Sequence, residues 1–357
     1  MIATANTNLN VRVGCPSVNA PNYTYVKPGD RIEYDDIVTG DSYEGNDKWL
    51  HGTDGNYYWS GGVDVEPGVV LSVDTAPWWL TDFGIPNIAP EERGKGVVVA
   101  LLDTGLDNSS DDIKRIKIAG QHNMLTGGED VSDNVGHGTD CAGVMAGWGP
   151  ALQGIAPSVS LLVVKVTDSE NNVDGNALAN GIDWAVKNGA QIISMSLCIP
   201  GGMPEDHPSL FSAVKSASDK HVILVASIGN NRATTYDFIN YPACFYQQCV
   251  SVGAINRKRV IIDLTTRNRN LNIVAPGADI PALIPLNNCN RLNGTSFSTA
   301  YASGVFSLAM SMAPGKSSDQ IKSAVLTSPK DSANYDPPYV KAYGIINPLD
   351  AISQLKG

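Results

Sequence analysis

The apolar runs after residue 95 constrain the fold of this chain more than any other feature of its sequence. Each run is short, rich in Val, Ile and Leu, and continuous rather than alternating, which is typical of strands buried on both faces of a parallel sheet. Segments with helical periodicity lie at 176–188, 210–220 and 296–313. This alternation predicts an α/β domain with helices packed on a parallel sheet. The runs are 96–102, 161–166, 192–196, 222–226 and 250–254.

The first 70 residues follow a different pattern. Short extended runs with aromatic residues are separated by turn signals, such as Pro-Gly-Asp at 28–30 and Asp-Gly-Asn at 54–56. Alternation with a period of two predicts a small all-β unit. We therefore expect two domains, at residues 1–72 and 73–357. The extended runs are 9–13, 31–34, 49–51 and 57–59.

The charge balance argues against polyanionic binding partners. The chain has 25 Lys and Arg residues against 36 Asp and Glu residues, a formal net charge of −11 at pH 7, and its basic residues form no cluster. Such a surface repels nucleic acids and anionic lipid. No apolar run reaches the roughly 18 residues of a membrane helix, so we predict no membrane span. The opening ten residues show no signal-peptide pattern, so we expect a protein that stays inside the cell or has lost a signal.

The six cysteines form no CxxC pair, which argues against a zinc or redox centre. Cys244 and Cys249 are close enough in sequence to close a short loop in an oxidising compartment. Cys141, Cys198 and Cys289 lie in apolar or glycine-rich surroundings, which favour small buried thiols. Cysteine usage therefore leaves the location of the protein open.

Four polar residues stand where the predicted α/β domain would expose them. Asp103 follows the first apolar run directly, and His137 lies between two glycines. Asn230 follows another run, and Ser296 precedes a long helical segment. Each has a structural alternative: a turn for the Asp and the Asn, packing for the His and a helix cap for the Ser. None of the four decides the function alone.

Together, the acid, the imidazole and the hydroxyl make up the set that nucleophilic acyl transfer requires. A serine hydroxyl is a poor nucleophile, so the imidazole must take its proton while the carboxylate fixes the tautomer of the imidazole. The free N–H groups at the start of the helix that follows Ser296 would stabilise an oxyanion. The amide of Asn230 would add a second donor.

The motifs around these residues resemble those of the subtilisin-like serine peptidases, the subtilases. They read Asp103-Thr-Gly, Gly136-His137-Gly-Thr, Gly229-Asn230 and Gly294-Thr-Ser296, in the family's chain order. The similarity also takes in 154–157, 241–243 and 275–277 and covers residues 78 to 355.

This resemblance implies a subtilisin-like parallel-sheet domain with serine endopeptidase activity on protein or peptide substrates. Ser296 would form the acyl-enzyme, with His137 as general base and acid. Asp103 would orient the histidine, and Asn230 would lie in the oxyanion hole. The chemistry requires no cofactor. Two segments would flank the specificity pocket, and they consist of Ser196, Leu197 and Cys198, and of Ser227, Ile228 and Gly229.

Several positions depart from the family pattern. Cys198 stands where a glycine is usual, and Asn-Asn-Val at 171–173 replaces a glycine-rich strand. Ala300 replaces a proline that often follows the serine motif. A short connector at 148–153 stands where many relatives carry a calcium-binding loop. We therefore assign no metal site, and the sequence leaves the question of a structural calcium ion undecided. The acidic residues Glu129, Asp130 and Asp133 are interpreted as a solvated face.

The N-terminal unit resembles a bacterial SH3-like barrel, on the basis of residues 9–12, 28–30, Trp49 and Trp59. Such barrels often bind cell-wall peptides, which favours a secreted or cell-envelope enzyme, with a cytoplasmic one as the alternative. A packing role for the barrel also stays open. Two rival functions remain: a peptide-binding pseudoprotease with an altered cleft, and an enzyme that its N-terminal domain holds inactive.

Overall fold

The computed structural model describes residues 1–20, 22–65, 77–149, 152–168, 172–201, 204–231, 239–286, 289–328 and 344–357. The chain divides into two compact units, one of residues 1–75 with 279–293 and one of residues 76–278 with 294–357. The boundary that we expected at residue 72 lies outside the described residues. The grouping of the hairpin β17 (Ile280–Leu286) and β18 (Cys289–Leu292) with the first unit was not expected.

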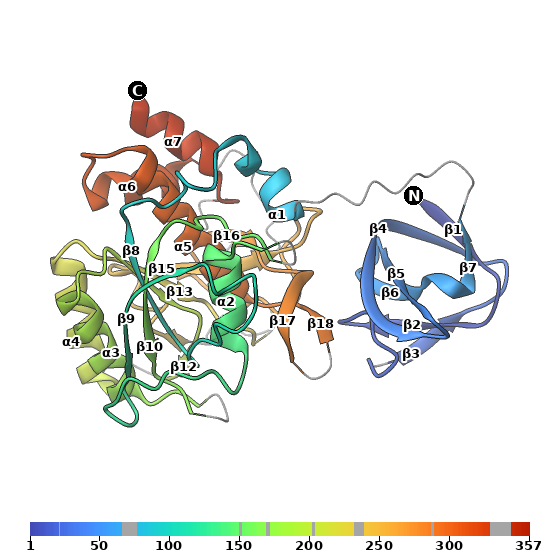
Figure 1. Ribbon diagram of the computed structural model, residues 1–357, viewed down its shortest axis with the longest axis horizontal. Helices are drawn as coiled ribbons and strands as arrows, with labels where there is room; N and C mark the ends of the chain where they lie inside the picture. Colours follow the sequence, from blue (N-terminus) through green and yellow to red (C-terminus); the bar gives the residue numbers. More distant parts are fainter. Residues whose placement is uncertain are drawn as a thin grey trace. The chain divides into compact units, whose positions relative to one another are not determined.

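The first unit is built on a seven-stranded antiparallel sheet in the order β3-β2-β6-β5-β4-β1-β7 (Figure 1). Alternation along β2 buries Leu9 and Val11, which join Tyr34 and Leu50 in an apolar core. This arrangement confirms the small all-β unit. The strands are β1 (Ile2–Ala5), β2 (Leu9–Val13), β3 (Asn22–Val26), β4 (Arg31–Tyr43), β5 (Asn46–Gly52), β6 (Asn56–Trp59) and β7 (Val63–Val65), with a 3₁₀ turn η1 (Ser60–Gly62).

The second unit contains the expected parallel sheet, in the order β16-β15-β13-β11-β8-β10-β9. Successive strands are added on one side of β8 and then on the other, so the strand order reverses beside β8. In such sheets, functional groups gather at the carboxyl ends near this reversal. The strands are β8 (Val98–Asp103), β9 (Lys117–Asn123), β10 (Ser160–Lys165), β11 (Ile192–Met195), β13 (Ile223–Ser227), β15 (Cys249–Ile255) and β16 (Ile273–Pro276).

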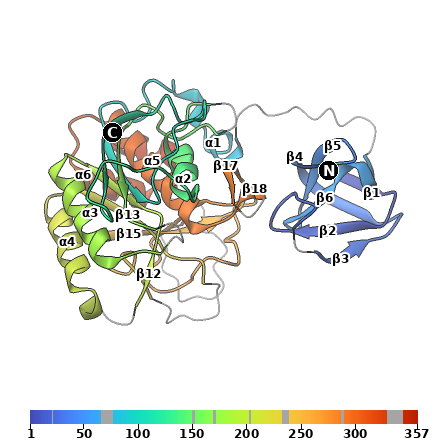
Figure 2. The ribbon, with the colours of Figure 1, turned by 60° about the horizontal axis from the view of Figure 1, so that its bottom comes forward.

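Helices cover both faces of this sheet (Figures 1 and 2). The neighbours α3 and α4 lie on one side, and α2 and α5 lie on the other. The helical segments expected from the sequence are confirmed as α3, α4 and α5. The strand β12 (Ile199–Pro200), which follows β11 in the chain, pairs with β14 (Asn240–Tyr241) in a separate two-stranded antiparallel sheet. The helices are α1 (Trp78–Thr81), η2 (Ile85–Asn87), α2 (His137–Ala146), α3 (Gly175–Lys187), η3 (Pro204–Asp206), α4 (Pro208–Asp219), α5 (Thr295–Met312), α6 (Ser318–Thr327) and α7 (Pro348–Lys356).

The cysteines differ in state. Cys15 is in a disulfide, whereas Cys141, Cys198, Cys244 and Cys249 are free thiols. The short loop suggested for Cys244 and Cys249 is therefore not closed, and the sulfur of Cys244 instead accepts a hydrogen bond from Asn268 Nδ2 at 3.9 Å. The side chain of Cys289 lies outside the described residues.

No helix in the part of the chain that the structure describes is long and apolar enough to cross a membrane.

Candidate active site

Asp103 is the last residue of β8, so its carboxylate stands at the carboxyl end of the strand beside which the sheet order reverses. The side chain is almost completely buried. Its Oδ1 accepts a hydrogen bond from the backbone N–H of Thr104 at 2.8 Å and lies 2.7 Å from Nδ1 of His137. The carboxylate therefore faces the imidazole across a short charged hydrogen bond.

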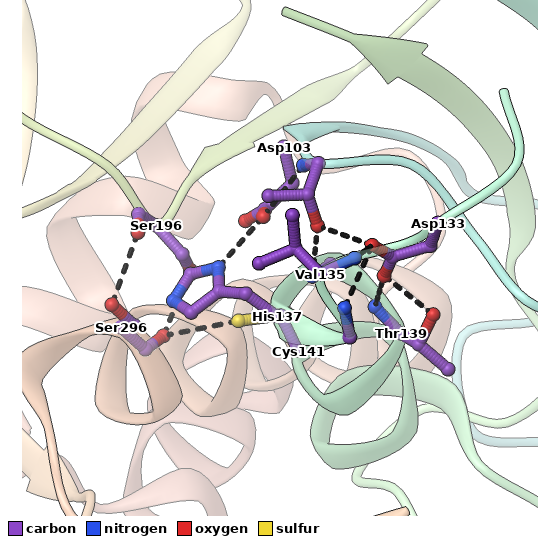
Figure 3. A network of polar contacts seen from close by, with 11 residues as sticks. Asp103, Asp133, Val135, His137, Thr139, Cys141, Ser196 and Ser296 are labelled. Carbon is purple, nitrogen blue, oxygen red and sulfur yellow. Dashed lines mark hydrogen bonds and ion pairs between the residues drawn. The ribbon is translucent and has the colours of Figure 1, made fainter. Parts of the chain in front are cut away.

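His137 begins α2, and the glycine before it makes that position possible. Gly136 has φ +94°, in the left-handed region that side chains rarely adopt, and it forms the N-terminal boundary of the helix. Figure 3 shows the imidazole between Asp103 and Ser296, with one ring nitrogen bonded to the carboxylate and the other turned towards the serine. Burial alone would lower the pKa of His137, but the charge and hydrogen bond of Asp103, together with the charges of Asp140 and Asp133, outweigh it and raise that pKa above its ordinary value.

Ser296 is the second residue of α5, where the first N–H groups of a helix have no partner inside the helix. Two hydrogen bonds join it to Ser196. The hydroxyl of Ser296 donates to the Ser196 carbonyl at 3.0 Å, and the Ser196 hydroxyl donates to the Ser296 carbonyl at 2.8 Å. The reciprocal pair fixes the start of α5 against the segment that follows β11.

Asn230 follows β13 and is exposed. Its Oδ1 accepts hydrogen bonds from the N–H and the hydroxyl of Thr295, at 3.0 and 2.9 Å. The amide nitrogen Nδ2 lies beside Gly294, where a Cβ atom would come within 3.4 Å of it. The amide is thus oriented with its donor group beside the turn that leads into Ser296.

The two predicted pocket segments follow neighbouring parallel strands, β11 and β13. Part of their backbone is already paired. The N–H of Ile228 donates to Val252, its carbonyl accepts from Asn240 Nδ2 at 2.8 Å, and the Gly229 carbonyl accepts from Thr266. The hydroxyl of Ser227 contacts Thr295 Oγ1 at 2.6 Å. Leu197 is buried and Cys198 is partly exposed.

The interpretation of Asp133 as part of a solvated face is wrong. Glu129 and Asp130 are exposed, but the Asp133 side chain is only 8% exposed. Its carboxylate accepts hydrogen bonds from neighbouring backbone and hydroxyl groups, so it is part of the fold around His137. The signal in the sequence was its position three residues before Gly136, because Asp side chains often bond backbone N–H groups just ahead in the chain.

Among the described residues, one group of potential metal ligands has atoms within 4.8 Å of one another: Asp103, His137 and Cys141. The first two are bonded to each other, and the Cys141 sulfur lies 4.0 Å from the Ser296 carbonyl oxygen, to which it donates. Burial raises the pKa of the Cys141 thiol well above its ordinary value, so the sulfur is a neutral thiol rather than a thiolate ligand. Each of the three side chains therefore takes part in a hydrogen bond of the site.

Known proteins resemble both parts of the chain. Residues 94–344 match the subtilase family, and residues 2–64 match the bacterial SH3 domain family. Subtilisin DY of Bacillus licheniformis is 30% identical over 281 residues, which are 76% of this chain and 98% of that protein. The major intracellular serine protease of Bacillus subtilis is 37% identical over 248 residues, 67% of this chain and 76% of that protein.

A solved structure of the prenylagaramide maturation protease PagA has a TM-score of 0.66 and 27% identity, covering 77% of this chain and 98% of that one. The parallel sheet with its flanking helices agrees with this likeness. The antiparallel sheet of the first unit agrees with the match to SH3 domains. The chain therefore belongs to the subtilase family, and it is a serine endopeptidase whose catalytic domain follows a bacterial SH3 domain.

Proposed function

We propose that the protein hydrolyses peptide bonds through an acyl-enzyme on Ser296. The observation that carries this proposal is the 2.7 Å hydrogen bond between His137 Nδ1 and Asp103 Oδ1. It holds the imidazole in the tautomer whose other nitrogen can accept a proton. That nitrogen is turned towards Ser296 (Figure 3). No cofactor takes part in this chemistry.

In the first half of the reaction, the Ser296 hydroxyl leaves its hydrogen bond to the Ser196 carbonyl and turns to His137. His137 takes the proton while Oγ forms a bond to the substrate carbonyl carbon. The carbonyl oxygen becomes an oxyanion, which accepts hydrogen bonds from the Ser296 N–H and Asn230 Nδ2. When the C–N bond breaks, the imidazolium gives its proton to the leaving amine.

In the second half, His137 takes a proton from water as the water oxygen attacks the acyl carbonyl carbon. The bond between that carbon and Ser296 Oγ breaks, and the proton passes from His137 to Oγ. Asp103 stays ionised and stabilises the imidazolium in both halves. The raised pKa of His137 supports this role, because the site favours the protonated ring.

We further propose that the segments Ser196 to Cys198 and Ser227 to Gly229 flank the substrate side chain before the cleaved bond. Free backbone groups in such segments can pair with an extended peptide. Because Ile228 and Gly229 already use part of their backbone in the fold, we assign the pairing to the segment after β11.

The match to bacterial SH3 domains supports a second proposal, that the N-terminal unit binds a cell-wall or other peptide ligand. Such a ligand would place the enzyme at the cell envelope or outside the cell. The Ser296→Ala protein, which cannot digest its ligand, should sediment with purified cell-wall peptidoglycan. Failure to sediment would overturn this placement.

Substitution of the nucleophile tests the main proposal. The Ser296→Ala protein should hydrolyse a peptide substrate only at background rate, because the variant lacks the hydroxyl that forms the proposed acyl-enzyme. The control is Ser212→Ala, which removes an exposed hydroxyl on α4 and should keep full activity. Equal rates for Ser296→Ala and the control, with both proteins folded by circular dichroism, would disprove the assignment and favour a different site.

A further inference from the structure

The buried carboxylate of Asp133 accepts five hydrogen bonds (Figure 3). Its Oδ1 accepts from the Thr104 hydroxyl at 2.8 Å and from the N–H groups of Val135 and Gly136 at 3.1 and 2.8 Å. Its Oδ2 accepts from the N–H and the hydroxyl of Thr139, at 2.9 and 2.7 Å. One side chain therefore bonds the segment after β8, the loop before His137 and the first turn of α2.

The bonded groups flank the two residues whose hydrogen bond orients the imidazole. Thr104 directly follows Asp103, and its hydroxyl also accepts from the N–H of Gly138 at 2.8 Å. Gly136 and Gly138 lie on either side of His137 in the chain. The carboxylate of Asp133 and the hydroxyl of Thr104 thus form a bridge between the backbone that carries Asp103 and the backbone that carries His137.

We propose that Asp133 is a positioning residue of this peptidase, whose buried carboxylate holds the start of α2 against the end of β8 so that His137 Nδ1 keeps its hydrogen bond to Asp103. This inference rests on the proposed catalytic roles of those two residues. Asp133 acts through the neighbouring backbone and takes no part in the chemistry itself.

The electrostatics agree with an ionised carboxylate. Burial would raise the pKa of Asp133, but the hydrogen bonds from Thr139, Gly136 and Thr104 outweigh it and lower that pKa below its ordinary value. All five of its partners are donors, and only a carboxylate accepts from all of them without offering a hydrogen of its own. Burying an amide there would direct an N–H₂ group at another donor.

The charged groups near His137 come from three places. Asp103 ends β8, Asp140 is buried in α2 and Asp133 lies in the preceding loop, and all three raise the pKa of His137. Cys141 in α2 is a neutral thiol. Removing the charge of Asp133 should therefore lower the pKa of His137, whereas a loss of folded protein alone would leave that pKa unchanged.

The test compares Asp133→Asn with Asp130→Asn, a matched loss of charge at an exposed site in the same loop. For Asp133→Asn we expect kcat to fall about tenfold, which corresponds to about 1.4 kcal/mol in the activation free energy. KM should stay within about twofold, and the acid limb of kcat/KM should move to lower pH. Asp130→Asn should behave like the wild type. Wild-type kcat and an unmoved acid limb in Asp133→Asn would overturn the proposal.

A second pair of variants decides the matter if Asp133→Asn does not fold. Thr104→Val removes the bridging hydroxyl, and Thr104→Ser keeps it. We expect Thr104→Val to lower kcat with little change in KM and Thr104→Ser to restore kcat. Equal activity of the two variants would contradict the bridge.

A readout without catalysis separates this inference from the proposed function. In Ser296→Ala proteins, the pKa of the His137 ring can be followed by NMR titration with Thr104→Val, which removes the bridge without changing any charge, and with Thr104→Ser, which keeps it. A lower pKa with Thr104→Val than with Thr104→Ser supports the bridge to Asp133 even if the wild type proved inactive, and equal pKa values refute it. Absence of hydrolysis by the wild type would instead overturn the proposed function.

Discussion

At the scale of single residues, the proposed catalytic side chains are oriented by hydrogen bonds to the atoms that take no part in the reaction. His137 is oriented by the bond of Nδ1 to Asp103, and Asn230 by the bonds of its Oδ1 to Thr295. In each residue, the bonded atom fixes the direction of the nitrogen with the proposed catalytic role, which is Nε2 in His137 and Nδ2 in Asn230. The motifs in the sequence identified these residues but not the supporting partner Asp133, because its position three residues before Gly136 also suits a solvated Asp in a polar loop.

The donor group of Asn230 can be tested separately from its acceptor. Asn230→Asp keeps an oxygen for Thr295 but loses the N–H₂ donor, and Asn230→Ala loses both. Both variants should lower kcat by about 10²–10³ with little change in KM, a range that is the known effect of losing a single oxyanion donor in subtilisin, itself a member of this family. Steady-state kinetics on a peptide substrate measure the loss, and a kcat within twofold of wild type would remove Asn230 from the oxyanion hole.

The raised pKa of His137 predicts the pH dependence of activity. In the proposed mechanism the neutral imidazole is the base, so kcat/KM should rise as the pH increases through the pKa of His137, with a midpoint above the ordinary value of 6.5. Asp103→Asn removes the main stabilising charge, so the midpoint should move to lower pH while the rate at the plateau falls sharply. A pH profile of kcat/KM for both proteins provides the check, and a midpoint that does not move in the variant would contradict the assignment.

The same raised pKa affects stability in a defined direction. Because the folded protein binds the imidazole proton more tightly than the unfolded chain, this group stabilises the fold fully below the unfolded pKa. That contribution is lost as the pH rises through the folded pKa. Asp103→Asn should therefore lower the unfolding free energy, measured by urea unfolding, more at pH 5 than at pH 9.

At the scale of elements, the site depends on how closely α5 packs in the second unit. The helix is buried along most of its length and is rich in Ser and Ala, whose small side chains let neighbouring segments approach. Gly304 lies against Ile155, where a Cβ atom would come within 2.7 Å of the Ile155 Cβ. The middle of α5 is therefore held by close packing, and its start, which carries Ser296, is held by the bonds to Ser196.

We predict that Gly304→Ala destabilises the protein by about 1–3 kcal/mol, because the added methyl group overpacks this contact. The control is Gly175→Ala at the first position of α3, where the nearest atom lies 3.5 Å from an added Cβ and alanine favours the helix. Urea unfolding of the two variants gives the comparison. Equal urea midpoints for the two variants would show that α5 can shift to make room for the methyl group without a loss of stability.

In the parallel sheet, the strands that the sequence predicted are buried on both faces, which gives each of them a continuous apolar run. β9 was missed, since it lies at the edge of the sheet and its residues alternate between exposed and half-buried until Asn123. β16 was missed because it ends in Pro276, and a proline within an apolar run argues against a strand in the interior of a sheet. The bounds of the predicted helices agreed to within about two residues, since their apolar faces and flanking turns are local signals.

At the scale of the whole molecule, the sequence predicted two kinds of fold along one chain, and both are confirmed. The change from alternating to continuous apolar runs separates an antiparallel sheet from a parallel one. The grouping of the hairpin at 279–293 with the first unit was outside the reach of pattern analysis. That grouping depends on contacts between segments far apart in the chain, which no local period records.

Labelling with a fluorophosphonate tests the central claim most directly, because the reagent bonds only to a serine that a neighbouring base activates. Mass spectrometry of the digested protein should find one adduct, on the peptide that contains Ser296. The adduct should be absent from Ser296→Ala and should form far more slowly in Asp103→Asn, where the orientation of His137 is lost. An adduct on another serine, or none in the folded wild type, would contradict the account.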